Sequence, residues 1–187
     1  MRKTGDCYDK KVQGKYKNLI LIQSSVDTYA MKMEKTLVLL KPGILQRRIV
    51  GTILNRFERK GLKIVALKML DLGQNSALVE AHYKEHEGKS LYQGLVKYMK
   101  SGPIIALVLE GEDCIALTRK LTGSTFTNEA LPGTIRGDYA ASGRLSIIHA
   151  SGTEPGVAEQ EIARFFKPEE IFSWEDPNDP WFYDRYD

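Results

Sequence analysis

The sequence has few of the features that mark secreted, membrane-bound or zinc-binding proteins. Among its 187 residues there are only two cysteines, Cys7 and Cys114, and their wide separation matches no metal-ligand motif. No apolar run approaches the length of a transmembrane helix, and the run Leu19–Ile22 is too short for a secretory signal. We therefore expect a cytoplasmic protein with no membrane partner and no metal-ligand set of its own.

The two common phosphate-binding motifs are also absent. The chain contains neither Gly-x-x-x-x-Gly-Lys-Ser/Thr nor a Gly-x-Gly-x-x-Gly turn after a strand, so any phosphate chemistry must use other groups. His82 and His86 stand four residues apart, but no His-Glu-x-x-His motif joins them and no third ligand is evident. We interpret both as surface or partly packed histidines.

Positive charge is concentrated at the N-terminus. Residues 1–33 hold seven lysines and arginines against three aspartates, a local charge of +4, whereas the rest of the chain carries −1. The body of the protein is therefore not a polycation, and nucleic acid is not expected as its main partner. We interpret residues 1–33 as a basic extension that is disordered or loosely attached, with a basic arm for anionic partners as the alternative.

Strand and helix patterns alternate through the remainder of the chain. Apolar runs predict strands at residues 36–40, 62–70, 104–109 and 145–148, and helical periodicity predicts helices at 49–57, 75–83, 92–100, 112–121 and 155–166. Residues 124–143 form a long loop without strand patterns. Four short strands with intervening helices favour an α+β fold of ferredoxin-like type, a four-stranded antiparallel sheet with helices packed on one face.

His149 ends an apolar run, and small and polar residues follow it before the last predicted helix begins. An imidazole at a strand end is held by the sheet and is well suited to taking up and releasing a group near neutral pH. Taken alone, a hydrogen-bonded structural histidine is the more common interpretation.

Glu161 falls within the apolar stripe of the predicted helix 155–166, four residues from both Val157 and Phe165. A carboxylate on a buried face is uncommon unless it has a partner. Because this helix follows His149 directly, Glu161 is a candidate for holding the imidazole in orientation. The alternative is a rim position whose carboxylate reaches water.

Three cations accompany this pair: Lys41 at the end of the first strand, Arg119 on a helix, and Arg136 in the long loop. Arginine binds phosphate oxygens in a fork and lysine acts as a point charge, so together they suit an anionic phosphate chain. Considered singly, each is more simply interpreted as a surface cation.

From about Lys35 to Trp174 the chain resembles the nucleoside diphosphate kinases, whose fold is ferredoxin-like. Several blocks in the right order carry the resemblance: Lys41-Pro42, Gln46-Arg47, Arg56-Phe57-Glu58, Gly94-Leu95-Val96-Lys97-Tyr98-Met99, Ser101-Gly102-Pro103, Pro132-Gly133-Thr134-Ile135-Arg136-Gly137-Asp138, Ile147-Ile148-His149-Ala150-Ser151, and Lys167-Pro168-Glu169-Glu170.

The resemblance implies an enzyme that moves the terminal phosphate of a nucleoside triphosphate, typically ATP, to a nucleoside diphosphate by a ping-pong mechanism. His149 matches the histidine that is transiently phosphorylated, Glu161 the glutamate that orients it, and Ser151 the serine beside it. Mg²⁺ is implied as an ion carried with the nucleotide. The positions that match nucleotide contacts are Lys41, Tyr83, Leu91, Arg119, Thr125, Arg136 and Ser146.

This chain departs from the family pattern at several of these places. Gly43 stands where the family has aspartate, Leu91 where an aromatic residue stacks on the base, Ser146 where asparagine is usual, and Gly152 where aspartate often follows; Leu145 replaces an arginine. These departures are the support for the alternative function, a catalytically weakened member that acts as a nucleotide- or nucleic-acid-binding module.

The domain of this type is expected over residues 34–174, followed by a tail at 175–187 that is rich in aromatic and acidic residues. Aromatic side chains are enriched at protein interfaces, and a mobile tail seldom carries so many. The resemblance implies a homo-oligomer, a tetramer or hexamer, and we expect the tail to help hold it.

Overall fold

The computed structural model describes residues 33–141 and 146–183. The basic extension predicted over residues 1–33 therefore lies outside the described residues, except for Met33. That residue is the first of β1 (Met33–Leu40) and so belongs to the sheet. None of the helices within the described ranges is both long enough and apolar enough to cross a membrane.

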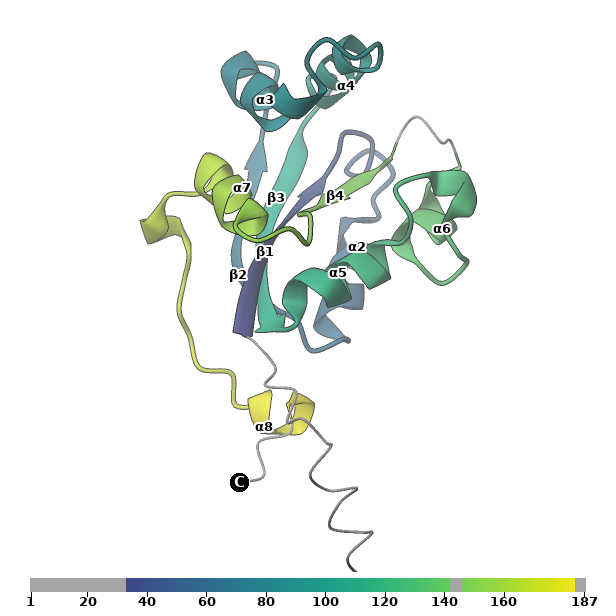
Figure 1. The fold of residues 1–187 in the computed structure, drawn as a ribbon. Coiled ribbons are helices and arrows are strands. Elements are labelled where there is room, and N and C mark those ends of the chain that lie inside the picture. The colour runs from purple at the N-terminus through teal and green to yellow at the C-terminus, as the bar shows by residue number, and fades with distance from the viewer. Residues whose placement is uncertain (1–32, 142–145, 184–187) are drawn as a thin grey trace, which may run out of the picture. The chain divides into compact units, whose positions relative to one another are not determined.

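Four strands form one sheet in the order β2-β3-β1-β4, and all neighbouring strands are antiparallel. Strand β1 lies between β3 (Ile104–Glu112) and the short β4 (Ile148–Ala150), and β2 (Lys63–Leu70) forms the opposite edge. The predicted α+β class with a ferredoxin-like antiparallel sheet is confirmed (Figure 1).

Helices cover both faces of this sheet, which corrects the expectation of helices on one face. Alternate residues of β1 enter two different cores, Leu37 and Leu39 on one side and Val38 and Leu40 on the other. Strands buried on both faces need apolar residues at every position, which explains the unbroken apolar runs of β1 and β3. Figure 1 shows α7 on one side of the sheet and α2 and α5 on the other.

The helices and short 3₁₀ turns include five helices close to the predicted ranges, and five short elements, at 84–86, 127–129, 135–139, 168–170 and 179–182, where none was predicted. They are α2 (Val50–Glu58), α3 (Ser76–His82), η1 (Lys84–His86), α4 (Tyr92–Met99), α5 (Cys114–Thr122), η2 (Thr127–Glu129), α6 (Ile135–Tyr139), α7 (Val157–Phe165), η3 (Pro168–Glu170) and α8 (Asp179–Phe182). The Thr134 hydroxyl caps α6 by accepting from the Gly137 amide, which gives this five-residue helix a defined start.

Strand β4 lies later in the chain than its apolar run predicted. Its ladder pairs Leu39 with His149, and flanking bonds run from the Lys41 amide to the Ile147 carbonyl and from the Ser151 amide to the Leu37 carbonyl. Backbone pairing with β1 thus continues past the last isoleucine, because any residue can contribute its backbone groups to a ladder. His149 consequently lies within the strand and not at its end.

The segment after α7 returns along the outer edge of β2. The Phe172 amide donates to the Val65 carbonyl at 2.8 Å, and the Trp174 indole donates to the Ile64 carbonyl at 3.3 Å. Further on, the Tyr183 hydroxyl donates to the Gly61 carbonyl at 2.7 Å. Gly61 has a φ of +86°, and the Phe182 ring lies where a side chain at this position would stand. The described part of the tail therefore packs on its own chain.

Removing residues 176–187 is expected to lower the free energy of unfolding by about 2 kcal/mol, since it deletes the hydrogen bond from the Tyr183 hydroxyl to the Gly61 carbonyl and the half-buried Phe182 ring. Thermal unfolding followed by circular dichroism measures the loss. A control truncation that removes only residues 184–187 keeps both contacts and should unfold close to the full-length temperature. Equal melting temperatures for all three chains would show that the tail contacts add nothing to stability.

Candidate functional site

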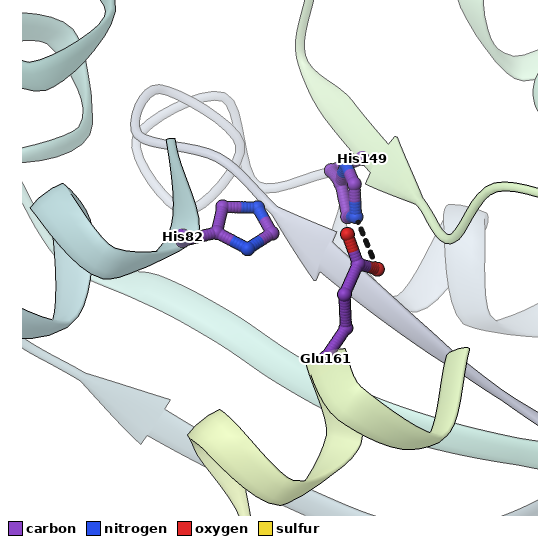
Figure 2. A group of neighbouring side chains, drawn as sticks. All are labelled: His82, His149 and Glu161. Atoms are coloured by element: carbon purple, nitrogen blue, oxygen red, sulfur yellow. Dashed lines mark hydrogen bonds and ion pairs between the residues drawn. The ribbon is translucent and has the colours of Figure 1, made fainter. Parts of the chain in front are cut away.

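His149 lies in β4 with its Nε2 atom 2.9 Å from the Glu161 Oε2 atom of α7 (Figure 2). The Ser151 hydroxyl donates to the same carboxylate oxygen at 2.6 Å. When Nε2–H donates to a carboxylate, the neutral imidazole carries its lone pair on Nδ1. In this arrangement the lone pair of His149 lies on Nδ1, because the other ring nitrogen is engaged.

Glu161 is a charged group inside the protein. Burial opposes its ionisation, but the hydrogen bonds and charge of His149 together with the Ser151 hydroxyl outweigh burial and lower its pKa to about 2. The side chain retains only 11% of its exposure. A carboxylate that stays ionised against an imidazole fixes the ring's orientation and stabilises positive charge on it.

His82, at the last position of α3, is buried against His149, which corrects its interpretation as a surface or partly packed residue. Its ring meets that of His149 edge-on, with centroids 4.7 Å apart, and also contacts Tyr83 and Phe165. Burial, with the neighbouring His149, lowers its pKa to about 3. His82 is therefore neutral. His86 is partly exposed, as expected, and lies beside Glu85.

Two guanidinium groups bind backbone carbonyls of β4 and of Ser151, the residue that follows it. Arg136 donates to the carbonyl of Ile148 at 2.9 Å, and Arg119 donates to the carbonyls of Ala150 and Ser151 at 3.4 and 3.3 Å. The charges are thus fixed on either side of His149. Carbonyl partners satisfy the donors without neutralising the charge, so both groups remain available to an anion.

The charged forms of Lys41 and Arg136 are destabilised by burial and by neighbouring positive charge. Burial, and then the charge of Arg136, lowers the pKa of Lys41 to about 8, and burial with Arg119 lowers the pKa of Arg136 to about 10. Buried like charges that depress one another favour a bound anion, which relieves their repulsion. The Lys41 Nζ atom lies 5.8 Å from the centre of the Tyr83 ring.

The structure brings most of the predicted site residues into this group. Tyr83 is buried beside His82, and burial raises its pKa. The Ser146 hydroxyl accepts from the Arg136 Nε atom and donates to the Ile148 carbonyl, both at 2.9 Å. Leu91 and Thr125 are exposed, and within the described ranges neither side chain joins the hydrogen-bonded group around His149.

The loop that carries Arg136 is anchored from α2. The Arg56 guanidinium binds the Asp138 carboxylate at 2.5 Å and also the Gly133 carbonyl, and Asp138 accepts from the Gly133 amide at 2.7 Å. Gly137 allows a close approach, because a Cβ atom there would collide with the Leu131 carbonyl. These contacts fix the start of α6 and hence the position of Arg136.

Two features of the site could not be read from the sequence pattern. Glu154 places its carboxylate where a side chain at residue 152 would stand, so it fills the space left by Gly152. His82 shares the buried face of α3 with Val79, three residues earlier, and that spacing is the only signal of its burial. Its contact with His149 joins residues 67 positions apart and has no local signature.

The sequence matches a family model and several known proteins over most of its length. Residues 34–171 match the family model described as nucleoside diphosphate kinase. The chain is 46% identical over 153 residues to a nucleoside diphosphate kinase of Archaeoglobus fulgidus, covering 82% of this chain and 99% of that protein. It is 49% identical over 139 residues to one from Thermus thermophilus, covering 74% and 99%.

A solved structure shows the same relationship in three dimensions. A halophilic nucleoside diphosphate kinase from Halobacterium salinarum, in complex with CDP, superposes with a TM-score of 0.78 at 41% identity. The match covers 81% of this chain and 99% of that one.

Replacing Arg56 by methionine is expected to weaken nucleoside diphosphate binding by about tenfold, since the loop that carries Arg136 loses its anchor to Asp138 and Gly133. Calorimetric titration with a nucleoside diphosphate measures the change. Arg59→Met is the matched control, because Arg59 is exposed at the end of the same helix. If both variants bind as the original chain does, the Arg56 anchor has no bearing on the anion site.

Proposed function

This chain belongs to the nucleoside diphosphate kinase family, and from that premise and the geometry around His149 we propose that it transfers the terminal phosphate of a nucleoside triphosphate, typically ATP, to a nucleoside diphosphate through a phosphohistidine. As a member of this family it is a nucleotide-binding phosphotransferase. The observation that carries the proposal is the His149–Glu161 pair bracketed by Arg119 and Arg136.

In the first half-reaction the Nδ1 lone pair of His149 attacks the terminal phosphorus. An N–P bond forms while the P–O bond to the leaving nucleoside diphosphate breaks, and positive charge develops on the ring. Glu161, fixed on Nε2, stabilises that charge. A second nucleoside diphosphate then attacks the phosphohistidine, and the same bonds are exchanged in reverse. The covalent intermediate makes the kinetics ping-pong.

Lys41, Arg119 and Arg136 are proposed to bind the phosphate oxygens. Charge on the transferred group spreads over its oxygens in the transition state, and cations already held in position require no rearrangement to meet it. Support comes from the pKa values of Lys41 and Arg136, which burial and mutual repulsion lower to about 8 and about 10. An anion between these groups relieves both effects.

Tyr83, Leu91, Thr125 and Ser146 are proposed as further nucleotide contacts. Tyr83 supports this because its hydroxyl is buried and has no hydrogen-bond partner within the described residues. Ser146 is more constrained, since Arg136 and the Ile148 carbonyl already engage its hydroxyl. Leu91 is half exposed and offers an apolar surface at the start of α4. The binding of CDP to the Halobacterium relative supports a nucleoside diphosphate as ligand.

Mg²⁺ fits this site as an ion carried by the nucleotide. Lys41, Arg119 and Arg136 carry only N–H donors and offer no oxygen ligand to Mg²⁺, so the ion would have to arrive with the nucleotide. Water and phosphate oxygens would hold it, as magnesium prefers, with no protein ligand required. Its contribution when bound is to neutralise charge on the phosphate chain.

We propose in addition that the chain forms a homo-oligomer. The edge strand β2 exposes Leu67 and Met69, at 47% and 60%, and the tail exposes Trp181. Apolar side chains gathered on an edge strand and a tail favour burial against another subunit. Tetramer and hexamer are the two assemblies expected.

The competing function is a catalytically weakened member that acts as a nucleotide- or nucleic-acid-binding module. Its support is the set of departures at Gly43, Leu91, Leu145, Ser146 and Gly152. Against it, the groups that would carry the chemistry form one bonded set: His149, Glu161, Ser151, Arg119 and Arg136.

Incubation with a nucleoside triphosphate labelled in its terminal phosphate should give a phosphoprotein that is labile to acid and stable to base, because phosphorus is bound to nitrogen. His149→Ala should remove the label and phosphoryl exchange while the melting temperature stays within a few degrees. The control His86→Ala changes a histidine outside the site and should be labelled normally. Labelling that survives loss of His149 would contradict the proposed nucleophile, and a folded chain that takes up no label would favour the binding module.

Glu161→Gln is expected to lower kcat by about ten- to hundredfold with a much smaller change in nucleotide affinity, because the carboxylate acts on charge that develops only during transfer. Steady-state kinetics with both substrates separates kcat from KM. Glu159→Gln, an exposed acid on the same helix, is the matched control. A rise in KM with unchanged kcat would assign Glu161 to substrate contact instead.

A further inference from the structure

Three metal-binding side chains converge at His149 from separate elements. His82 comes from α3, His149 from β4 and Glu161 from α7, and one ligand atom of each lies within 4.8 Å of the other two. Figure 2 shows the His82 ring directed toward the His149–Glu161 pair. The sequence indicated no metal-ligand set, because the three residues share no local motif.

A second observation on His82 itself points to a ligand. His82 is only 6% exposed, and its Nδ1 atom is buried without a hydrogen-bond partner among the described residues. Buried polar atoms are normally paired, so an imidazole nitrogen without a partner indicates a missing one. The proposed phosphoryl transfer does not use His82.

The donor types select the class of ion. Two imidazole nitrogens and one carboxylate oxygen form the set found at many zinc sites that keep a fourth position open to water. Zn²⁺ and its neighbours Co²⁺ and Cu²⁺ favour imidazole, whereas Mg²⁺ favours oxygen ligands. The ion expected here is therefore different from the one that accompanies a nucleotide.

The distances allow such an ion after a small adjustment. Zn–N and Zn–O bonds of about 2.0–2.1 Å place tetrahedral ligand atoms about 3.3 Å apart. His149 Nε2 and Glu161 Oε2, at 2.9 Å, need only separate slightly. The His82 nitrogen must approach by up to roughly 1.5 Å, a shift that side-chain rotation at the end of a helix can supply.

We propose that His82, His149 and Glu161 bind Zn²⁺ or a similar transition-metal ion, and that the ion inhibits phosphoryl transfer. The metal bonds to Nε2 of His149 in place of the proton shared with Glu161, and that proton moves to Nδ1. The Nδ1 lone pair is then no longer available to attack phosphorus. Glu161, bound to the ion, also ceases to stabilise the ring's charge. The inhibition rests on the proposed role of His149, but the binding of the metal does not.

Binding is tested on the full chain without nucleotide, with Co²⁺ as a coloured probe. A four-coordinate Co²⁺ site absorbs visible light far more strongly than the hydrated ion, so a titration reports both coordination and affinity. All proteins carry Cys7→Ser to remove a competing thiol, since Cys114 is buried. The expected result is a saturable absorption at one ion per chain that Zn²⁺ abolishes.

Two variants assign the site. His82→Asn and His82→Phe should weaken Co²⁺ binding by at least about 100-fold, because one of three protein ligands is lost. His86→Phe is the control, since His86 is the one histidine outside the cluster in a chain that has three. Two different replacements guard against misfolding, which melting curves detect. Unchanged binding in a folded His82 variant, or no absorption in the parent, overturns the inference.

Inhibition is tested separately in zinc-buffered assays with excess Mg²⁺ and nucleotide, each protein being compared with its own zinc-free rate. Zinc should inhibit the parent, a chelator should restore activity, and the His82 variants should need at least about 100-fold more free zinc. An active parent that binds Co²⁺ but is unaffected by Zn²⁺ overturns the inhibitory role. A parent that binds Co²⁺ but shows no zinc-free turnover contradicts the proposed function and leaves the metal site standing.

Discussion

The hydrogen bond between His149 and Glu161 is the interaction on which the rest of the site depends. Removing the hydrogen-bond partner of a buried carboxylate costs about 1–3 kcal/mol or more, since its charge is left without a donor. The hydrogen bond therefore requires β4 and α7 to be positioned accurately relative to each other. The pairing of Leu39 with His149 fixes one partner, and the packing of Ile162 and Phe165 against the sheet fixes the other. The sheet and its covering helix are thus specified together with the chemistry.

The arginines around this pair are held by neutral carbonyl groups, so their positive charge is not neutralised. Arg119 and Arg136 satisfy part of their donor capacity with carbonyl groups of β4 and the adjoining loop. A carboxylate partner would have held them equally well but would have competed with phosphate for the same charge. Burial and mutual repulsion destabilise the charged forms of Lys41 and Arg136, and both pKa values are lowered. A bound anion would relieve this repulsion.

Much of the fold was predictable from the sequence, because its central strands have an unmistakable pattern. The apolar runs of β1 and β3 exist because helices cover both faces of the sheet. The expectation of helices on one face is wrong because it does not take account of these runs. The prediction for β4 ends too early in the chain, because backbone pairing does not depend on the side-chain pattern from which strands are predicted. Met33 was assigned to the extension for a similar reason, since an exposed first strand residue has no distinctive hydropathy.

The site likewise contains some residues that the sequence pattern reveals and others that only the fold reveals. Glu161 can be identified from the sequence because an acidic residue stands out within the apolar stripe of a helix. His82 was missed because a histidine on a buried helical face is ordinary, and only the fold brings it to His149. The anchor from Arg56 to Asp138 is equally invisible, since it joins residues far apart in the chain.

The departures of this chain from its family have unequal weight when judged by burial. Ser146 and Gly152 lie close to His149 in the sequence. The Ser146 hydroxyl has a hydrogen-bond partner on both sides, and the Glu154 carboxylate fills the space next to Gly152. Leu91 is half exposed, where stacking on a base is worth about 1–3 kcal/mol at most. The groups proposed to meet the phosphates are buried cations, whose interactions strengthen as water is excluded. A chain built this way can lose base contacts more readily than phosphate contacts, because the phosphate chain is the part of the substrate that all nucleoside diphosphates share.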